Sequence, residues 1–297
     1  CTASGVPTCI QTPSSRSPNS RSCSLARSNI LVSENSPAGA SALTGFDCLR
    51  VYFASGSGLC LGSDGVRGGA FSFDKNLNVT HRFDISGLPS RVRVSPDGRY
   101  GAMTVFVAGH SYMEIGFSTR TMIVDLQTGA TVIDSMEEFA VYKDGDRMES
   151  IDFNFWGVTF TGDDRTFYAT LQTGGSQYLI RGDTEAKRAD VLKSNVECPS
   201  LSPDGTRLAF KKRVSAGLLG QEWRLYTLDL ATLEETPLGE DRNIDDQVEW
   251  LDNDHILYQV RDDSTIRTDT WSIATTPDAE PELRWQSTYS PAVVRGG

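Results

Sequence analysis

The tetrapeptide Ser95-Pro96-Asp97-Gly98 returns later in the chain as Ser202-Pro203-Asp204-Gly205. In both copies Pro presets φ for the second position of a type I turn, Asp can hydrogen-bond the local backbone, and Gly suits the last position. Runs typical of β-strands flank each copy, such as Val92-Arg93-Val94 before the first and Leu208-Ala209-Phe210 after the second. The two copies therefore predict two β-hairpins of the same kind.

Two weaker copies follow the same template. They are Phe160-Thr161-Gly162-Asp163-Asp164 and Trp250-Leu251-Asp252-Asn253-Asp254, and each precedes an apolar run. With Ser95, Thr161, Ser202 and Leu251 as register marks, successive corners lie 66, 41 and 49 residues apart. Such steps are typical of the blades of a β-propeller, and the longest step indicates an insertion.

Each corner is expected to be followed by a third strand and a fourth, outer strand. Third-strand candidates lie at residues 70–74, 121–126, 177–181, 223–230 and 270–273. They predict five blades. In the first blade we expect the second strand at 49–54 and the fourth at 79–84, with no first strand before them.

The missing strand has a candidate at the other end of the chain. Tyr289-Ser290-Pro291-Ala292-Val293-Val294 repeats the inner-strand pattern. We expect it to pair with the N-terminal blade, because that pairing closes the ring and removes open sheet edges.

The repeat also has a third-strand signature, Ile123-Val124-Asp125-Leu126-Gln127-Thr128-Gly129 in one blade and Leu225-Tyr226-Thr227-Leu228-Asp229-Leu230 in another. Together with Ser-Pro-Asp-Gly, this pattern resembles the TolB-type β-propeller repeat, closely over residues 92–129 and 199–230 and loosely over 48–294. The resemblance implies an all-β propeller of four-stranded antiparallel blades. Typical members have six blades, so residues 25–47 could hold a sixth, degenerate one. The family's periplasmic members bind peptide segments and partner proteins at the mouth of the central channel.

Composition limits the class of partner. The chain has 297 residues, 38% of them hydrophobic, with a formal net charge of −11. Nucleic acid and anionic lipid surfaces both favour basic proteins, so neither is an expected partner. Residues 1–24 are rich in Ser, Thr, Pro and Arg and are expected to form a flexible tether, which leaves residues 25–297 as a single propeller domain.

The sequence begins with Cys1, which a polar spacer and then the folded domain follow, as in a mature bacterial lipoprotein. This pattern predicts a lipid anchor on Cys1, removal of a signal peptide, and a place in the bacterial cell envelope, periplasmic or at the cell surface. The alternative is that the sequence happens to start at a cysteine.

Five further cysteines follow, at positions 9, 23, 48, 60 and 198. No Cys-x-x-Cys occurs and the chain has three histidines, so we expect no metal site and no cofactor. In an oxidising compartment, proximity in sequence pairs Cys9 with Cys23 and Cys48 with Cys60, and leaves Cys198 free.

Propellers bind ligands where their inner strands converge, which directs attention to the positions four and five residues before each register mark. From these positions, with Val294 taken as the mark of a last corner, we select as candidate binding residues Arg91, Trp156, Glu197, Asp246, Gln247 and Tyr289. Two aromatic rings, one cation and two carboxylates would suit a peptide, a protein segment or a glycan. The alternative is that these are ordinary residues at the start of strands.

Catalytic motifs are scarce. The chain has no Gly-x-Ser-x-Gly elbow and no P-loop, and of its histidines only His110 falls in a predicted loop. The preferred prediction is therefore a non-enzymatic binding or scaffold protein of the cell envelope. A propeller-type polysaccharide lyase or hydrolase, using Glu197 and Asp246 with a loop histidine, is the first alternative. A structural subunit of an envelope assembly is the second.

Overall fold

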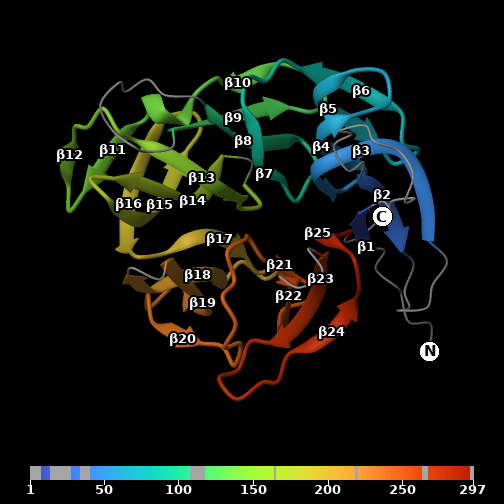
Figure 1. Ribbon diagram of the computed structural model, residues 1–297. Coiled ribbons are helices and arrows are strands. Elements are labelled where there is room, and N and C mark those ends of the chain that lie inside the picture. Colours follow the sequence, from blue (N-terminus) through green and yellow to red (C-terminus); the bar gives the residue numbers. More distant parts are fainter. Residues whose placement is uncertain are drawn as a thin grey trace.

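The computed structural model describes residues 8–13, 28–33, 41–107, 118–163, 165–217, 220–262 and 267–294. These residues form an all-β propeller of five four-stranded antiparallel blades around a central axis (Figure 1). The predicted fold class and blade count are confirmed. Within these ranges one short 3-10 helix occurs, η1 (Met136–Glu138), and no helix is long and apolar enough to cross a membrane.

Each blade runs from an inner strand at the axis to an outer strand at the rim. The first consists of β3 (Ser41–Ala54), β4 (Ser57–Ser63), β5 (Gly68–Asp74) and β6 (Val79–Phe83). The second consists of β7 (Leu88–Val94), β8 (Tyr100–Val107), β9 (Ser118–Asp125) and β10 (Thr131–Ile133). The third consists of β13 (Asn154–Phe160), β14 (Thr166–Thr173), β15 (Ser176–Asp183) and β16 (Arg188–Ser194). The fourth consists of β17 (Glu197–Leu201), β18 (Arg207–Gly217), β19 (Gly220–Asp229) and β20 (Glu235–Pro237). The fifth consists of β21 (Glu249–Trp250), β22 (His255–Asp262), β23 (Arg267–Ala274) and β24 (Glu282–Trp285).

The insertion expected in the longest step is a short hairpin between the second and third blades. It consists of β11 (Ala140–Lys143) and β12 (Asp146–Met148). Strand β11 pairs in parallel with β16, so the hairpin extends the third sheet to six strands. It therefore widens the rim and leaves the axis unchanged.

The corners between inner and second strands share one hydrogen-bond pattern. Ser95 Oγ donates to Asp97 Oδ1 (2.5 Å) and accepts from the Tyr100 N–H (2.8 Å). The second copy repeats both bonds through Ser202, at 2.6 and 3.0 Å. Thr161 also donates to the aspartate two residues on, at 2.7 Å. The hydroxyl of the motif thus stabilises the corner by bonding both to a side chain and to the backbone.

Apolar clusters between neighbouring blades form the core. Four of the clusters join side chains from two adjacent sheets, as Leu59 with Met103, Ile123 with Phe155, Leu179 with Phe210, and Leu225 with Trp250. All these side chains are buried. Because every blade packs on two neighbours, closure of the ring is needed to cover the faces of the first and last blades.

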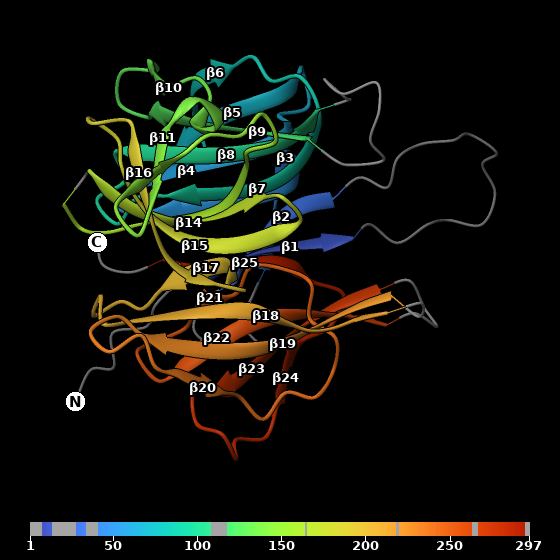
Figure 2. The same cartoon turned by 90° about the vertical axis from the view of Figure 1, so that its left-hand side faces the viewer.

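Segments from both ends of the chain complete the ring. Strand β25 (Tyr289–Val293) pairs antiparallel with β1 (Thr8–Pro13), which pairs with β2 (Ser28–Ser33), which in turn pairs with β3. These strands lie between the fifth and first blades (Figures 1 and 2). The predicted closure by N- and C-terminal segments is confirmed. Residues 8–13 differ from the predicted tether, because β25 and β2 satisfy the backbone of β1 from both sides.

The first blade corrects one strand assignment. Residues 49–54, expected to be its second strand, belong to β3 at the axis, and β4 is the second strand. Strand β4 was missed because it contains Gly58 and Gly62, which lower strand propensity. A Cβ at Gly58 would lie 2.1 Å from the Phe73 ring, and one at Gly62 would lie 2.1 Å from the Asp47 carbonyl oxygen. Close packing requires both glycines.

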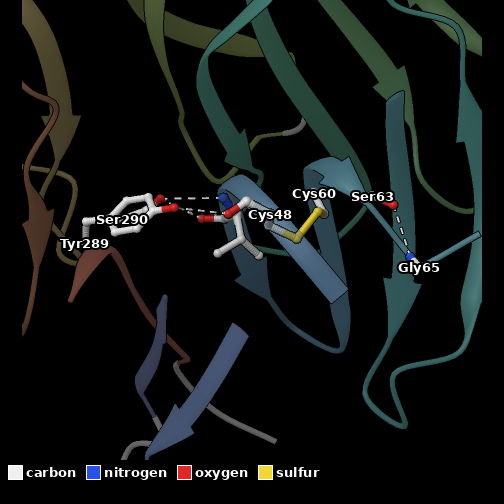
Figure 3. Close-up of a disulfide and its surroundings, with 7 residues drawn as sticks. Cys48, Cys60, Ser63, Gly65, Tyr289 and Ser290 are labelled. Carbon is white, nitrogen blue, oxygen red and sulfur yellow. Dashed lines mark hydrogen bonds between the residues drawn. A yellow bond between two sulfur atoms is a disulfide. The ribbon is translucent and has the colours of Figure 1, made fainter. Parts of the chain in front are cut away.

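Two of the cysteine predictions fall on described side chains. Cys48 and Cys60 form a disulfide between β3 and β4, with 5.6 Å between their Cα atoms (Figure 3), and Cys198 is free and buried. Cys1 and Cys23 lie outside the described residues. The lipid anchor and the Cys9–Cys23 bond therefore remain predictions.

Candidate binding site at the channel mouth

Three inner strands bulge at the position four residues before the register mark. Gly157, Cys198 and Ser290 occupy this position with φ of 64°, 50° and 56°. In β13 and β17 the pairing with the second strand shifts at the same place. A bulge bends its strand and changes where the neighbouring side chains point. The bulge is therefore a recurring property of the inner-strand repeat.

A cavity of about 400 Å³ opens where the inner strands begin, an end of the propeller that we call the channel mouth. Its walls combine three aromatic side chains, three glutamines and five charged groups. The lining residues, hereafter the mouth cavity, are Ser90, Arg91, Phe106, Trp156, Gln172, Gly175, Gln177, Glu197, Lys211, Arg213, Gln221, Trp223 and Asp245. Arg91, Trp156 and Glu197, three of the predicted residues, come together here.

Glu197 is the centre of the polar wall and is 3% exposed. It accepts a hydrogen bond from Trp223 Nε1 (2.9 Å), and Arg213 Nη2 (3.4 Å) and Lys211 Nζ (3.7 Å) form ion pairs with it. Lys211 also pairs with Asp245 and lies 4.5 Å from the centre of the Trp223 ring. Burial lowers the pKa of Lys211, but the acidic groups around it outweigh burial and hold the pKa above its usual value. Lys211 is therefore a fixed cation.

A second layer of charge lies deeper along the axis and is centred on Asp246. Its carboxylate pairs with Arg50 Nη1 (3.0 Å) and Arg91 Nε (3.2 Å) and accepts from Gln259 Nε2 (2.8 Å). Burial raises the pKa of Asp246, but the two guanidinium groups outweigh it, so the pKa lies below its usual range. Asp246 is thus an ionised structural group at the floor of the site.

A third layer lies beneath it. Arg93 pairs with Glu249, and its Nη2 donates to the Val248 carbonyl (3.1 Å). The Tyr52 hydroxyl donates to Glu249 at 3.0 Å, and its ring lies 4.5 Å from the Arg93 guanidinium. Charged side chains of both signs therefore lie along the axis.

The two remaining predicted residues do not line the mouth cavity. Gln247 Nε2 donates to the carbonyls of Pro199 (2.8 Å) and Val158 (3.3 Å), so it connects the segment before β21 with β17 and β13. The Tyr289 hydroxyl donates to the Cys48 carbonyl at 3.5 Å (Figure 3). Both contacts hold neighbouring strands in place.

Sequence reasoning missed Lys211, Arg213 and Trp223. Lys211 had a signal, because it lies opposite Glu197 in the β17–β18 pairing, nine residues after the Ser202 mark. Thr170 lies opposite Trp156 at the same offset from Thr161. Trp223 comes from the third strand, and neither its type nor its spacing distinguishes it from a core residue.

The described histidines lie away from these carboxylates. His81 Nε2 lies 3.2 Å from the Gln127 carbonyl oxygen, and His255 Nδ1 lies 3.0 Å from Asp252 at a corner. His110 lies outside the described residues. Within the described ranges no group of three or more His, Cys, Asp or Glu side chains is placed to hold a metal ion.

Comparisons place the fold among known propellers. No protein-family model and no curated protein matches the sequence. Among solved structures, TolB from Acinetobacter baumannii superposes with a TM-score of 0.63 at 17% identity, over 98% of this chain and 67% of that one. A chain of the nidogen/laminin complex gives 0.58 at 8% identity, over 97% and 98%. The tricorn protease gives 0.53 at 8% identity, over 86% of this chain and 29% of that one.

These identities are low, so the likeness concerns the fold. The corners, the five blades and the overlap with almost the whole chain agree with it. The chain is therefore a five-bladed β-propeller whose fold is similar to that of TolB.

Proposed function

We propose that this chain is a non-enzymatic binding protein that captures a protein partner at the channel mouth. The observation that carries the proposal is the mouth cavity, whose walls combine Trp156, Trp223 and Phe106 with paired charges. Such a pocket suits a projecting side chain or short segment of a partner, because aromatic area and a few fixed polar groups dominate binding energy at interfaces.

The surface around the mouth cavity supports a protein partner. Of the large hydrophobic side chains that are exposed in the described residues, most lie at the end of the blades where the inner strands begin. They are Leu49, Val66, Leu88, Phe106, Ile151 and Val214. Leu88 and Phe106 are direct neighbours across the β7–β8 pairing. Apolar groups gathered around a pocket are typical of interaction sites.

The two carboxylates that a lyase or hydrolase would use, Glu197 and Asp246, are engaged in ion pairs and hydrogen bonds with neighbouring strands. Glu197 binds Lys211, Arg213 and Trp223, and Asp246 binds Arg50 and Arg91. Proton transfer at either group would leave buried cations without partners, which is costly. These contacts favour binding over catalysis.

We also propose a place in the bacterial cell envelope, with a lipid on Cys1. The disulfide between Cys48 and Cys60 agrees with an oxidising compartment. In the native host, Cys1→Ala should move the protein from the membrane to the soluble fraction. An unchanged distribution would reject the anchor and leave the binding proposal intact.

The binding proposal is tested with Trp223→Ala. Trp223 lines the mouth cavity, and its removal leaves Glu197 with both cationic partners. Peptides selected from a displayed random library on the wild-type protein should bind Trp223→Ala at least about tenfold more weakly, as hot-spot truncations do. Calorimetry measures this, and circular dichroism checks the fold.

Trp271→Ala is the matched control, since Trp271 lies in the third strand of the next blade against Arg242 and not in the mouth cavity. It should bind selected peptides like the wild type. Equal affinity of Trp223→Ala and wild type would contradict the proposed site. If the wild-type protein bound glycans on an array and no peptide were selected from the library, the partner would be a glycan and not a protein.

A further inference from the structure

The axis carries an excess of positive charge in an otherwise acidic protein. Strand β3 contributes Arg50, and β7 contributes Arg91 and Arg93, which project to one face because they are two residues apart. Asp246 and Glu249 are the carboxylates that pair with them. These two layers therefore sum to one positive charge, although the chain as a whole carries −11.

The neighbouring layer does not supply the missing negative charge. There Lys211 and Arg213 face Glu197 and Asp245, which is a balanced set. A buried cation without a counter-charge is strongly unfavourable.

Two buried N–H groups of the same arginines have no acceptor among the described residues. Arg93 is 6% exposed, and its terminal nitrogens bond to Glu249, Ser200 and Val248, whereas its Nε has no hydrogen-bond partner. Arg91 Nε lies at ion-pair distance from Asp246 but makes no hydrogen bond. Buried polar groups are normally satisfied, so these two donors indicate a nearby acceptor besides the side chains already described.

A small cavity adjoins both arginines. It measures about 30 Å³, and Arg50, Arg91, Arg93, Asp246, Gln247 and Gln259 are among its lining residues, so three guanidinium groups and one carboxylate face it. This volume holds about one water-sized particle. A spherical ion in such a space can accept N–H groups from several directions.

We propose that this axial cavity binds one chloride ion, held by the Nε groups of Arg91 and Arg93. The ion balances the excess charge and satisfies both donors. It joins β3, β7 and the segment before β21, so it stabilises the inner ring beneath the mouth cavity.

The test compares thermal unfolding in sodium chloride and sodium gluconate at equal ionic strength and pH. A ligand that binds only the folded state raises the melting temperature with its concentration. The wild type should melt at a higher temperature in chloride, with the difference growing as chloride increases. Bromide should replace chloride. Equal melting temperatures in the two salts would reject the site.

Two variants and a diffraction experiment locate the effect. Arg91→Gln leaves Arg50 to neutralise Asp246, so its melting temperature should not distinguish the salts. Arg242→Gln, which breaks the pair with Glu240 away from the axis, should keep the wild-type difference. In crystals of the wild type grown with bromide, an anomalous peak should lie between Arg91 and Arg93. A water there without anomalous signal would overturn the proposal, whatever the behaviour of the variants.

Discussion

At the scale of the residue, the serine of the repeated corner has a structural purpose beyond its place in the motif. Ser202 is 3% exposed, and its hydroxyl both donates to Asp204 and accepts from the backbone of Arg207. The corner of the third blade has Thr161 at this position, whose hydroxyl also donates to the aspartate two residues on, although Asp163 accepts the Thr166 N–H there. We therefore expect that this position requires a hydroxyl and tolerates the additional methyl group of threonine.

This comparison gives a matched pair of substitutions. Ser202→Ala should lower the free energy of unfolding by about 1–2 kcal/mol, because the Arg207 N–H, at a partly buried position, loses its acceptor. Ser202→Thr should remain close to the wild type. Urea unfolding followed by tryptophan fluorescence measures both, and equal losses in the two variants would show that the hydroxyl is unimportant.

The bulge glycine of the third blade combines backbone strain with close packing. Gly157 has φ of 64°, and a Cβ there would lie 2.7 Å from Cys198 Cα. Gly205 has φ of 73° at a corner, with nothing within 4 Å of an added Cβ.

Gly157→Ala should therefore destabilise more than Gly205→Ala. Left-handed φ alone costs about 1–2 kcal/mol for a residue with a Cβ, and the contact with Cys198 adds to this at Gly157. The urea midpoints of the two variants measure the difference. Equal midpoints would mean that the inner strands of the third and fourth blades can move apart at Gly157 and Cys198 without loss of stability.

At the scale of the element, pairing decides the role of each strand. Strand β4 has little strand propensity, yet it lies between β3 and β5 and carries one half of the disulfide. Cys48 and Cys60 are fully buried in the cluster that also contains Ala292 of β25. The bond therefore secures the innermost pair of the blade on which the ring closes.

Replacing both cysteines by alanine should lower the free energy of unfolding by about 3 kcal/mol, because the cross-link restricts a loop of this length in the unfolded chain. Urea unfolding measures the change. The wild type unfolded and refolded in a reducing agent should show the same midpoint as the variant. A variant with the wild-type midpoint would indicate that strand pairing alone fixes this blade.

At the scale of the whole molecule, the corners and the turns between third and fourth strands hold a set of carboxylates that respond together to acid. Asp125 accepts the N–H groups of Gln127 and Thr128, and the other members bond their own turns in the same way. Burial raises the pKa of several of these carboxyls, but the hydrogen-bond donors around them lower it by more. The pKa values therefore lie below their usual range for Asp74, Asp125, Asp163, Asp183, Asp204, Asp229 and Asp252.

The sign of the pH dependence follows from these directions. A carboxyl with a lowered pKa in the folded state adds stability above its unfolded pKa of about 3.9, and this stability disappears as pH falls through the folded pKa. The urea midpoint should change little between pH 7 and pH 5 and fall steeply below pH 4, with several protons taken up on unfolding.

Asp204→Asn is the control for this behaviour. The amide oxygen can still accept from the corner N–H, but the side chain no longer titrates, so unfolding of the variant should take up fewer protons. If the urea midpoint of the wild type did not change between pH 4 and pH 3, the lowered pKa values of these aspartates would be contradicted.

The sequence by itself determined the corners, the number of blades and the pairing of the chain ends. These follow from contiguous residues whose turn chemistry is local, as in Ser95-Pro96-Asp97-Gly98, and from spacing along the chain. It also located three residues of the mouth cavity, since each lies at a fixed distance before a corner.

The tertiary structure alone decided the remainder. Strand β4 forms because its glycines fit against Phe73 and Asp47, and β1 forms because β25, at the other end of the chain, pairs with it. Trp223 reaches the mouth cavity from a third strand, and Arg50 meets Asp246 across 196 residues. Contacts of this kind depend on the closure of the ring, and closure brings together side chains whose own sequence neighbourhoods carry no sign of one another.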